Sequence, residues 1–414
     1  MHMVHRATGM KWIATGCLLL ASLQAVVAAE PAGTLEIIDA QPSWRLATKQ
    51  VRLAITQRGG HMAPVEFLAD TAEPVQPYHI SPWQNEKLAL DVPVLVPLRG
   101  DWFCVPFGGN GTPFKGETHP PHGEIAGAEW SFVKAGSDAA KGIHSLALEC
   151  ATRARPGKIR KELFLVDGHN VVYSANSVEG FAGPAPCGHH ATLAMPEAEG
   201  VFRIATSPIQ FGMTCPGVFS DPAKREYQSF ASGVRFNDLK KVPLQFKDAP
   251  DADVTRLPAR RGYADLLQVV NVPEGTAWTA ATRTDKNWLW FALKDPKVLR
   301  STVFWIENGG RHGSPWNGRN NCLGMEDVTA LFAEGLAPSA APNVLSEQGV
   351  PTVLEFSATK PISVRYIQGV TRVPAGFGQV QKVEFAPGKA TFIGEQGARV
   401  DVPVRHEFLA TGNL

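Results

Sequence analysis

The sequence lacks an excess of charge of either sign. It has 40 basic and 39 acidic residues among 414, and only 19% of its residues are charged. No block of lysine and arginine interrupts this balance, which argues against nucleic acid or an anionic membrane surface as the partner. We therefore expect a small ligand, and the overall charge favours a neutral one.

The sequence also lacks the short motifs that identify many enzymes. It contains no Walker loop, no HExxH, no GxSxG elbow and no EF-hand loop. No period of about 20–50 residues recurs, which disfavours propellers and solenoids. An active site must then be recognised from side chains that are distant in the sequence.

Cysteine is sparse and follows no metal-binding or redox pattern. No CxxC pair occurs, and five cysteines follow residue 29: Cys104, Cys150, Cys187, Cys215 and Cys322. The odd number leaves at least one thiol outside any disulfide within the chain. One or two disulfides are possible in an oxidising compartment, but we favour buried thiols that pack as small apolar side chains.

The N-terminus has the pattern of a cleavable secretory signal. Arg6 and Lys11 precede the apolar run WIATGCLLLASLQAVVAA, which ends in small residues. The run is too short and too weakly flanked for a lasting membrane span. We expect a signal peptide over residues 1–29, cleaved after Ala29 or one residue earlier, and a secreted or periplasmic protein.

The remaining residues, 30–414, predict one domain built of strands. The sequence has 32 prolines and 39 glycines, too many for a helix bundle. Short β-rich runs separated by turn residues predict the following strands: TLEII (34–38), VRLAIT (51–56), PVLVPL (93–98), HSLALEC (144–150), IRKELFLV (159–166), NVVYSANSV (170–178), VFRIAT (201–206), VFWI (303–306), SVRYI (363–367) and KVEFA (382–386). Strands without interleaved helices predict an all-β fold, a large antiparallel β-sandwich with few short helices.

Two local elements can be predicted more closely. VDGHNVVY (166–173) predicts a tight hairpin with His169 in its turn. MEDVTALFAEG (325–335) predicts one short amphipathic helix that ends at Gly335.

The first segment that could form a site runs from residue 98 to residue 130. The predicted strand before it brings in Arg99, whose fixed donors suit a pair of hydroxyls or a carboxylate. Trp102 and Trp130 offer faces that can stack on the apolar face of a pyranose.

Two histidines in the same segment, His119 and His122, raise the question of a metal. Two prolines stand between them in HPPH, and no set of acidic ligands accompanies them. We therefore predict no metal site. A purely structural loop, in which the histidines only form hydrogen bonds, remains an alternative.

The second segment is PAPCGHHATLAMPE (184–197), which carries two adjacent histidines. Neighbouring residues of an extended chain point to opposite faces, so only one of His189 and His190 can face a given cleft. The sequence alone does not decide which.

The third segment, GGRHGSPWNGRNNCLGMEDV (309–328), is a long polar loop that leads into a carboxylate. We expect the loop, with Arg311 and Trp316, to line a sugar-binding cleft with Glu326 at its floor. A carboxyl group in a walled cleft can have its pKa raised enough to serve as a general base. Alternatively, Glu326 only stabilises the first turn of the predicted helix.

Together these segments resemble the sugar-site signature of the aldose 1-epimerase (galactose mutarotase-like) superfamily, and especially its hexose-phosphate epimerase branch. The shared features are Arg-Gly followed by C-x-P-F-G, then His-Gly with a Trp about seven residues on, then GHHATLAMP, and finally LGMED. Their order and approximate spacing agree over residues 93–330.

The resemblance implies a role for each matched residue. His190 would be the general acid, with His189 in reserve, and Glu326 the general base. Arg99 and His122 would bind the substrate. The implied reaction opens and recloses a cyclic hemiacetal by proton transfer and needs no cofactor.

We add four side chains as expected contacts of a sugar or oligosaccharide: His189, Trp130, Arg311 and Trp316. Arg311 and Arg319 could also serve a carboxylated sugar such as a uronic acid. If an aldose 1-epimerase-like enzyme is the right interpretation, His190 or His189 must lie within about 7 Å of Glu326. The alternatives are a non-catalytic carbohydrate-binding protein and, less favoured, a polysaccharide lyase or hydrolase on the same fold.

Overall fold

The computed structural model describes residues 1–3 and 33–414, and Gly33–Leu414 forms one compact unit. The predicted signal peptide falls mainly on residues 4–32, which lie outside the described residues, and it stays a prediction together with the domain boundary at residue 30. Among the described helices, none has both the length and the apolar character needed to cross a membrane.

Two large antiparallel sheets make up most of Gly33–Leu414. In the described residues the larger sheet has nine strands, in the order β15 (Arg256–Leu257), β12 (Phe202–Thr206), β17 (Ala277–Arg283), β18 (Trp288–Lys294), β22 (Ile362–Arg372), β9 (Val171–Glu179), β8 (Gly157–Val166), β7 (Ile143–Thr152) and β6 (Ser131–Asp138). The other has seven, in the order β14 (Arg235–Phe236), β13 (Ile209–Thr214), β16 (Tyr263–Asn271), β19 (Ser301–Asn308), β20 (Asn321–Thr329), β11 (Cys187–Ala194) and β5 (Phe103–Cys104).

Smaller elements surround these sheets. A four-stranded sheet consists of β1 (Glu36–Ile38), β2 (Gln41–Ala47), β3 (Val51–Thr56) and β4 (Met62–Phe67), and a two-stranded one of β10 (Gly183–Ala185) and β21 (Leu354–Phe356). A three-stranded sheet consists of β23 (Val380–Ala386), β24 (Lys389–Gly394) and β25 (Arg399–Pro403). The described helices are short: η1 (Pro93–Leu95), η2 (Glu124–Ala126), η3 (Pro222–Lys224), α1 (Leu336–Ala340), η4 (Ser346–Gln348) and α2 (Phe408–Thr411).

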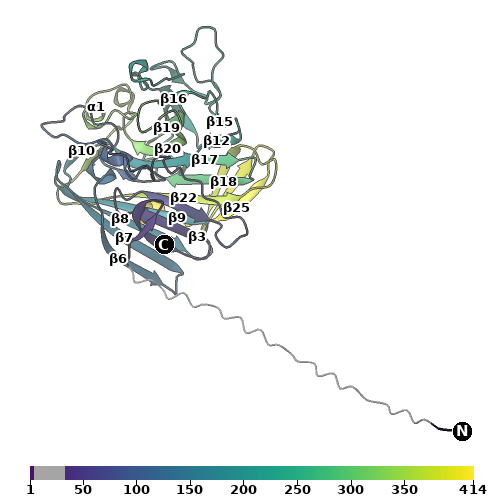
Figure 1. Ribbon diagram of the computed structural model, residues 1–414. Helices are drawn as coiled ribbons and strands as arrows, with labels where there is room; N and C mark the ends of the chain where they lie inside the picture. The colour runs from purple at the N-terminus through teal and green to yellow at the C-terminus, as the bar shows by residue number, and fades with distance from the viewer. Residues whose placement is uncertain (4–32) are drawn as a thin grey trace. The chain divides into compact units, whose positions relative to one another are not determined.

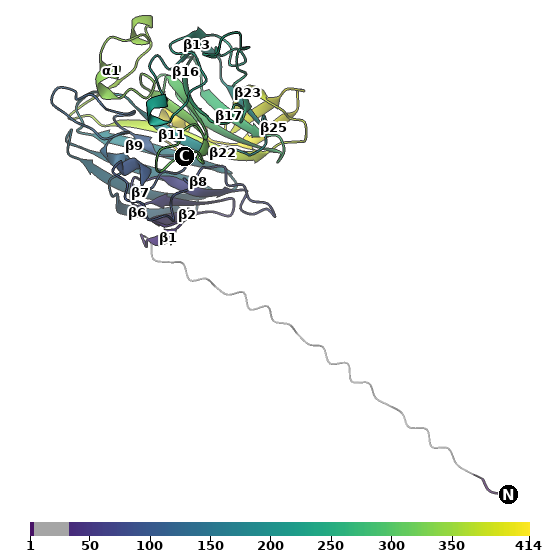
Figure 2. The same ribbon diagram turned by 45° about the horizontal axis from the view of Figure 1, so that its top comes forward.

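The two large sheets pack face to face. In Figure 1, β16, β19 and β20 lie above β22, β9 and β8, and Figure 2 shows β13 and β16 above β7 and β8. Side chains alternate between faces along each strand: Phe304 and Ile306 enter the core between the sheets, whereas Val303 and Trp305 join a second apolar cluster on the outer face of the seven-stranded sheet. This outer face carries the cavity described below.

The expected all-β sandwich with few short helices is confirmed. Each predicted strand overlaps an observed one except PVLVPL (93–98), which forms the 3-10 helix η1 and a turn, because its two prolines cannot donate to a strand ladder. The hairpin at 166–173 is confirmed, since β8 ends at Val166 and pairs with β9.

The helix predicted over residues 325–335 is wrong. This segment contains the end of β20, which pairs with β19 on one side and β11 on the other. Its amphipathic pattern could be read with either period, and pairing with two neighbouring strands decides in favour of the strand. Glu326 therefore caps no helix.

The five cysteines among the described residues are all free and buried: Cys104, Cys150, Cys187, Cys215 and Cys322. The favoured interpretation, small apolar side chains in the core, agrees with this arrangement, and none of the disulfides considered possible is present among the described residues. Cys17 lies outside the described residues.

Charged groups are buried between the sheets and join them. Asp327 on β20 accepts a hydrogen bond from Tyr366 on β22 at 2.7 Å and lies 2.6 Å from the ammonium group of Lys294 on β18. Lys294 and Asp327 are both fully buried. Removing one member of such a pair leaves a charge that neither water nor a partner compensates.

We predict that Lys294→Met lowers the free energy of unfolding by about 3–5 kcal/mol, because the Asp327 carboxylate loses its cation. The double variant Lys294→Met/Asp327→Leu should lose much less. Urea unfolding followed by tryptophan fluorescence measures both. The matched control is Lys382→Met, which removes an exposed ion pair with Glu384 and should change stability little. Equal losses in the single and double variants would contradict the prediction.

Candidate functional site

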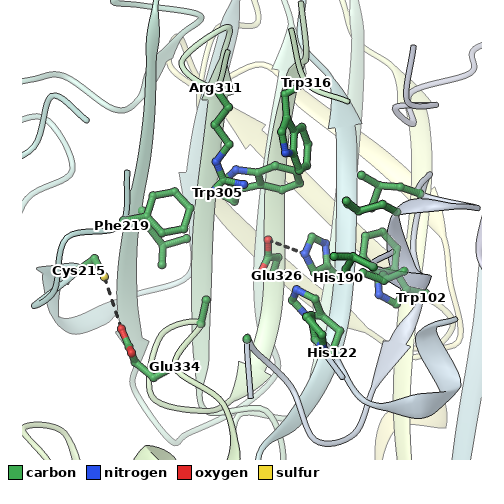
Figure 3. Close-up of a pocket in the computed structure, with 18 of the residues that line it drawn as sticks. Trp102, His122, His190, Cys215, Phe219, Trp305, Arg311, Trp316, Glu326 and Glu334 are labelled. Atoms are coloured by element: carbon green, nitrogen blue, oxygen red, sulfur yellow. Dashed lines mark hydrogen bonds and ion pairs between the residues drawn. The ribbon is translucent and has the colours of Figure 1, made fainter. Parts of the chain in front are cut away.

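His190 and Glu326 lie side by side on the outer face of the seven-stranded sheet. They are directly opposed residues of β11 and β20. His190 Nε2 is 3.1 Å from Glu326 Oε1, well inside the separation of about 7 Å expected for an epimerase. Figure 3 shows the two groups meeting at the wall of a cavity.

The adjacent residues on the same strands point the other way. His189 is fully buried, with its Nδ1 2.9 Å from Asp101 Oδ2 and its Nε2 3.0 Å from the Asn176 amide nitrogen on the nine-stranded sheet. The prediction that His189 contacts the sugar is therefore wrong, because the pleat directs it into the interior of the sandwich. The choice left open by the sequence falls on His190.

The contact between His190 and Glu326 is close but is not aligned as a hydrogen bond. Glu326 Oε1 has no hydrogen-bonding partner although it is buried. The other ring nitrogen of His190, Nδ1, lies 3.1 Å from the Thr192 hydroxyl oxygen. A buried polar atom without a partner is costly unless a ligand supplies one, so Glu326 Oε1 and the outer edge of His190 are available to a substrate.

Burial sets the protonation of this pair. Desolvation raises the pKa of Glu326 well above its usual value. Desolvation, with smaller contributions from His122 and His61, lowers the pKa of His190 well below its usual value. Both shifts disfavour the charged forms, so the pair keeps one proton over a wide range of pH.

Gly324 makes room for the Glu326 carboxyl group. A Cβ atom at position 324 would lie 2.4 Å from Glu326 Oε1 and 3.0 Å from Trp305 Cβ. Positions 324 and 326 are two apart on β20 and share one face of the strand. Only a glycine at 324 therefore leaves the Glu326 carboxyl group in its present place.

The cavity beside the pair has a volume of about 350 Å³, at the small end of the usual range for ligand sites. Its wall is mostly apolar and comes from segments that are distant in sequence: Val92, Val94, Leu95, Leu98, Trp102, Gly109, Pro121, His122, His190, Cys215, Val218, Phe219, Leu266, Trp305, Arg311, Trp316, Glu326, Ala333 and Glu334. A few polar groups on an apolar wall are typical of a small-molecule site.

Trp102 holds the His190 ring in place by stacking on one of its faces. The two rings stack 4.0 Å apart, and His61 stacks on the other face of the indole at 4.2 Å. The indole Nε1 of Trp102 is buried without a hydrogen-bonding partner. Trp102 borders the cavity, but both faces of its ring are covered by histidines, so stacking on a sugar is not supported and only its N–H group lacks a partner.

His122 reaches the cavity, as predicted for a substrate-binding residue. Its ring lies 4.8 Å from that of His190, and burial lowers the pKa of His122 to about 4. His119 instead faces Glu117, with its Nε2 3.0 Å from the carboxylate. Among residues 1–3 and 33–414, no group of three His, Cys, Asp or Glu side chains is placed to hold a metal ion.

Arg99 and Trp130 do not line the cavity, and the prediction of sugar contacts for them is not supported. Arg99 is fully buried and donates to the backbone carbonyls of Pro97, Ile38 and Asp39. Trp130 is buried as well, and its indole N–H donates to the carbonyl of Ile125. The loss of a strand at 93–98 explains the first difference, since Arg99 follows a turn that leads into the interior.

The polar loop between β19 and β20 contributes two of the predicted residues. Arg311 and Trp316 border the cavity, whereas Arg319 pairs with Glu86 at the surface, at 2.7 Å between Nη2 and Oε2. Trp316 packs edge-on against Trp305, with the ring centroids 5.9 Å apart.

Sequence reasoning missed several residues of the wall. Trp305 lies within VFWI, which was predicted only as a strand, Glu334 lies within the segment wrongly predicted as a helix, and nothing was predicted for Phe219. The alternation of VFWI gave a usable signal: if one of its faces enters the core, Trp305 lies on the opposite face. No such signal exists for Phe219 and Glu334, which come from loops.

We predict that Glu326→Gln makes stability less dependent on pH. Because the pKa of Glu326 is raised on folding, its carboxyl group favours the folded state fully below its unfolded pKa of about 4.5, and this contribution is lost as the pH rises above it. The variant, which cannot ionise, should therefore exceed the wild type in melting temperature by a margin that grows from pH 4 to pH 8. Thermal melts across this range measure the margin, with the exposed Glu355→Gln as control. A constant margin would refute the assigned direction.

No family model matches this sequence, and no curated protein sequence matches it. Solved structures do resemble it. A candidate aldose 1-epimerase from Escherichia coli K12 aligns with a TM-score of 0.52 and 12% identity, over 80% of this chain and 99% of that chain. One from Klebsiella pneumoniae aligns with a TM-score of 0.52 and 13% identity, over 79% and 78%. A protein from Synechocystis sp. PCC 6803 aligns with a TM-score of 0.50 and 11% identity, over 80% and 96%.

At these identities the likeness establishes the fold. The resemblance noted from the sequence is therefore confirmed at the level of the fold that this chain shares with the two candidate aldose 1-epimerases. The hexose-phosphate epimerase branch and secretion stay predictions.

Proposed function

We propose that this protein is an aldose 1-epimerase-like enzyme that interconverts the anomers of a free sugar or of a sugar end. The observation that carries the proposal is the contact of 3.1 Å between His190 and Glu326 at the wall of a cavity sized for one small ligand. An imidazole and a carboxyl group are the two proton-transfer groups that the reaction requires.

The reaction follows from these two groups. The Glu326 carboxylate takes the proton of the anomeric hydroxyl, the C1–O5 bond breaks as a carbonyl forms at C1, and protonated His190 gives its proton to O5. Rotation about C1–C2 presents the other face of the aldehyde, and the reversed transfers close the ring. Each cycle returns the proton to its starting place, so no cofactor or external acid is needed.

The burial of the pair suits this exchange. The reactive state, a carboxylate beside an imidazolium, holds the same single proton as the neutral pair that burial favours, so one internal transfer connects the two. Trp102 and Thr192 fix the His190 ring by stacking and by contact with Nδ1, which leaves Nε2 to face the substrate. His122 and the indole N–H groups of Trp102 and Trp305 can bind sugar hydroxyls.

A second candidate is a glycoside hydrolase, because Glu334 brings another carboxyl group to the same cavity. Hydrolysis of a glycosidic bond usually uses two carboxyl groups on either side of it. Release of nitrophenol from nitrophenyl glycosides would identify this activity, whereas an epimerase would leave such blocked sugars intact. A binding protein without activity would bind sugars and turn over neither kind.

We also propose that the protein acts outside the cytoplasm, after removal of residues 1–29. The basic N-terminus and its apolar run support this location.

Replacing Glu326 or His190 tests the proposed roles. We predict that Glu326→Gln and His190→Gln each lower kcat for anomer exchange by about 100- to 10,000-fold, because each removes one proton-transfer group. Exchange NMR between the α and β anomers, over a panel of sugars, measures the rate. Glu355→Gln, an exposed carboxylate, serves as the control and should match the wild type. Unchanged kcat in both variants would exclude this site.

The pH profile tests the single shared proton. The pair works while it holds one proton, so activity should fall only when a second proton binds or the last one leaves. The pKa of His190 is lowered, so the acid limb of kcat/KM, set by His190, should lie well below pH 6.5. The pKa of Glu326 is raised, so the alkaline limb, set by Glu326, should lie well above pH 4.5. Loss of the acid limb instead of the alkaline limb in Glu326→Gln would contradict these directions. Residual activity of Glu326→Gln should lack the alkaline limb.

A further inference from the structure

Arg311 places a cation at the wall of the cavity, framed by aromatic rings. Its guanidinium carbon lies 4.7 Å from the centre of the Phe219 ring, 5.2 Å from Trp316 and 5.8 Å from Trp305. Its side chain is 16% exposed, although it borders the cavity. Rings that cover the faces of a guanidinium leave its N–H edges as the part that can bind a ligand.

The guanidinium has spare donors. In the described part of the chain its closest acidic neighbour is Glu307, with 3.5 Å between Nε and Oε2, and neither of these two atoms has a hydrogen-bonding partner. The terminal nitrogens of Arg311 donate no hydrogen bond among the hydrogen bonds of the described residues. Of its N–H groups, Nε is buried without an acceptor and the terminal nitrogens remain for solvent or a ligand.

Glu307 only partly neutralises Arg311. Its Oε1 accepts hydrogen bonds from the backbone N–H groups of Gly310, at 2.9 Å, and of Arg311 itself, at 3.3 Å. Burial raises the pKa of Glu307 to about 7, against the opposing effect of Arg311. Near neutral pH a share of the molecules therefore carries a protonated Glu307 and an uncompensated guanidinium, which strengthens the attraction for an anion.

The backbone holds Arg311 in this position. His312 N donates to the carbonyl of Arg225 at 3.1 Å, and Gly318 N donates to the carbonyl of Arg311 at 2.8 Å. These backbone hydrogen bonds fix the loop that carries Arg311. Fixing the loop in advance lowers the entropy cost of binding an anion there.

Arg311 and His190 both border the cavity, on either side of Trp305. Figure 3 shows Trp305 between them, and the His190 ring centroid is 5.8 Å from that of Trp305. A pyranose that presents its ring oxygen to His190 carries its C6 group on the carbon next to that oxygen. Because C6 is the one carbon that projects out of the ring, we expect its substituent to extend past Trp305 to Arg311.

We propose that the sugar is a uronic acid whose C6 carboxylate binds the N–H edge of Arg311. This inference rests on the proposed function and names its substrate class. A carboxylate carries one negative charge, which the single arginine of the wall matches, and its planar fork suits a guanidinium. A sugar phosphate would bring a second charge into a cavity that already holds the Glu334 carboxyl group.

Binding and turnover, measured separately, test the proposal. D-glucuronate, D-galacturonate, D-glucose, D-galactose and D-glucose 6-phosphate are titrated into wild type, Arg311→Gln, Arg311→Lys and Arg319→Gln by calorimetry, and anomer exchange is followed by NMR. Arg319→Gln is the matched control, since Arg319 lies in the same loop but pairs with Glu86 at the surface.

We expect wild type to bind and turn over at least one uronate more efficiently than the matching neutral sugar. Arg311→Gln should weaken uronate binding by about 10- to 100-fold and change neutral sugars little, because it removes only charged hydrogen bonds. The uronate affinity of Arg311→Lys should lie between those of wild type and Arg311→Gln, and that of Arg319→Gln should match wild type.

Three outcomes would overturn the proposal: equal effects of Arg311→Gln on neutral and acidic sugars, tighter binding of the phosphate than of either uronate, or wild-type affinity in Arg311→Gln. Titrating Glu326→Gln with uronate separates this inference from the proposed function. Uronate that binds Glu326→Gln and wild type equally, with no turnover in either, supports Arg311 while refuting the epimerase. If wild type turns over neutral sugars and uronates equally well, and Glu326→Gln abolishes this turnover, the epimerase is supported and the uronate inference is refuted.

Discussion

The register of β20 between β19 and β11 is the constraint on which the rest of the site depends. Consecutive residues of this strand, Glu326 and Asp327, carry carboxyl groups that need opposite surroundings. The first borders a cavity beside an imidazole, and the second is held by Lys294 and Tyr366 between the sheets. A slip of one residue would exchange them, leaving Lys294 without its counterion and the cavity without the contact between His190 and Glu326. The buried ion pair therefore fixes the register of the strand that carries the site.

The same division applies to the facing strand. His190 turns to the cavity and His189 turns to Asp101 and Asn176. Each strand thus presents one titratable group to the cavity and one to the interior. The interior groups make the hydrogen bonds that hold the sheets together, and the outer groups are left with free polar atoms. This distribution explains why the charged residues of the sandwich centre and the polar residues of the cavity come from the same short stretches of sequence.

Much of the fold could be predicted from the sequence, because the strands carry alternating patterns and the turns carry their usual residues. Glu326, His190 and His122 were also predicted correctly as neighbours, since their motifs keep a recognisable order along the chain. The failures have physical causes. Period alone could not distinguish the strand at Glu326 from a helix, because pairing with β11 and β19 is a long-range effect. Arg99 was misplaced because the strand predicted before it is interrupted by proline. The loop residues Phe219 and Glu334 are brought to the cavity only by tertiary packing, which no local pattern encodes.

Gly324 links two positions that a sequence comparison would treat as independent. The carboxyl oxygen of Glu326 occupies the space that a side chain at position 324 would need, and Trp305 borders the same space. A descendant of this chain that kept Glu326 but acquired alanine two residues before it would carry a glutamate whose oxygen must move. Whatever chemistry selects the acid therefore also selects the glycine, and the two should be inherited, transplanted or redesigned as one unit.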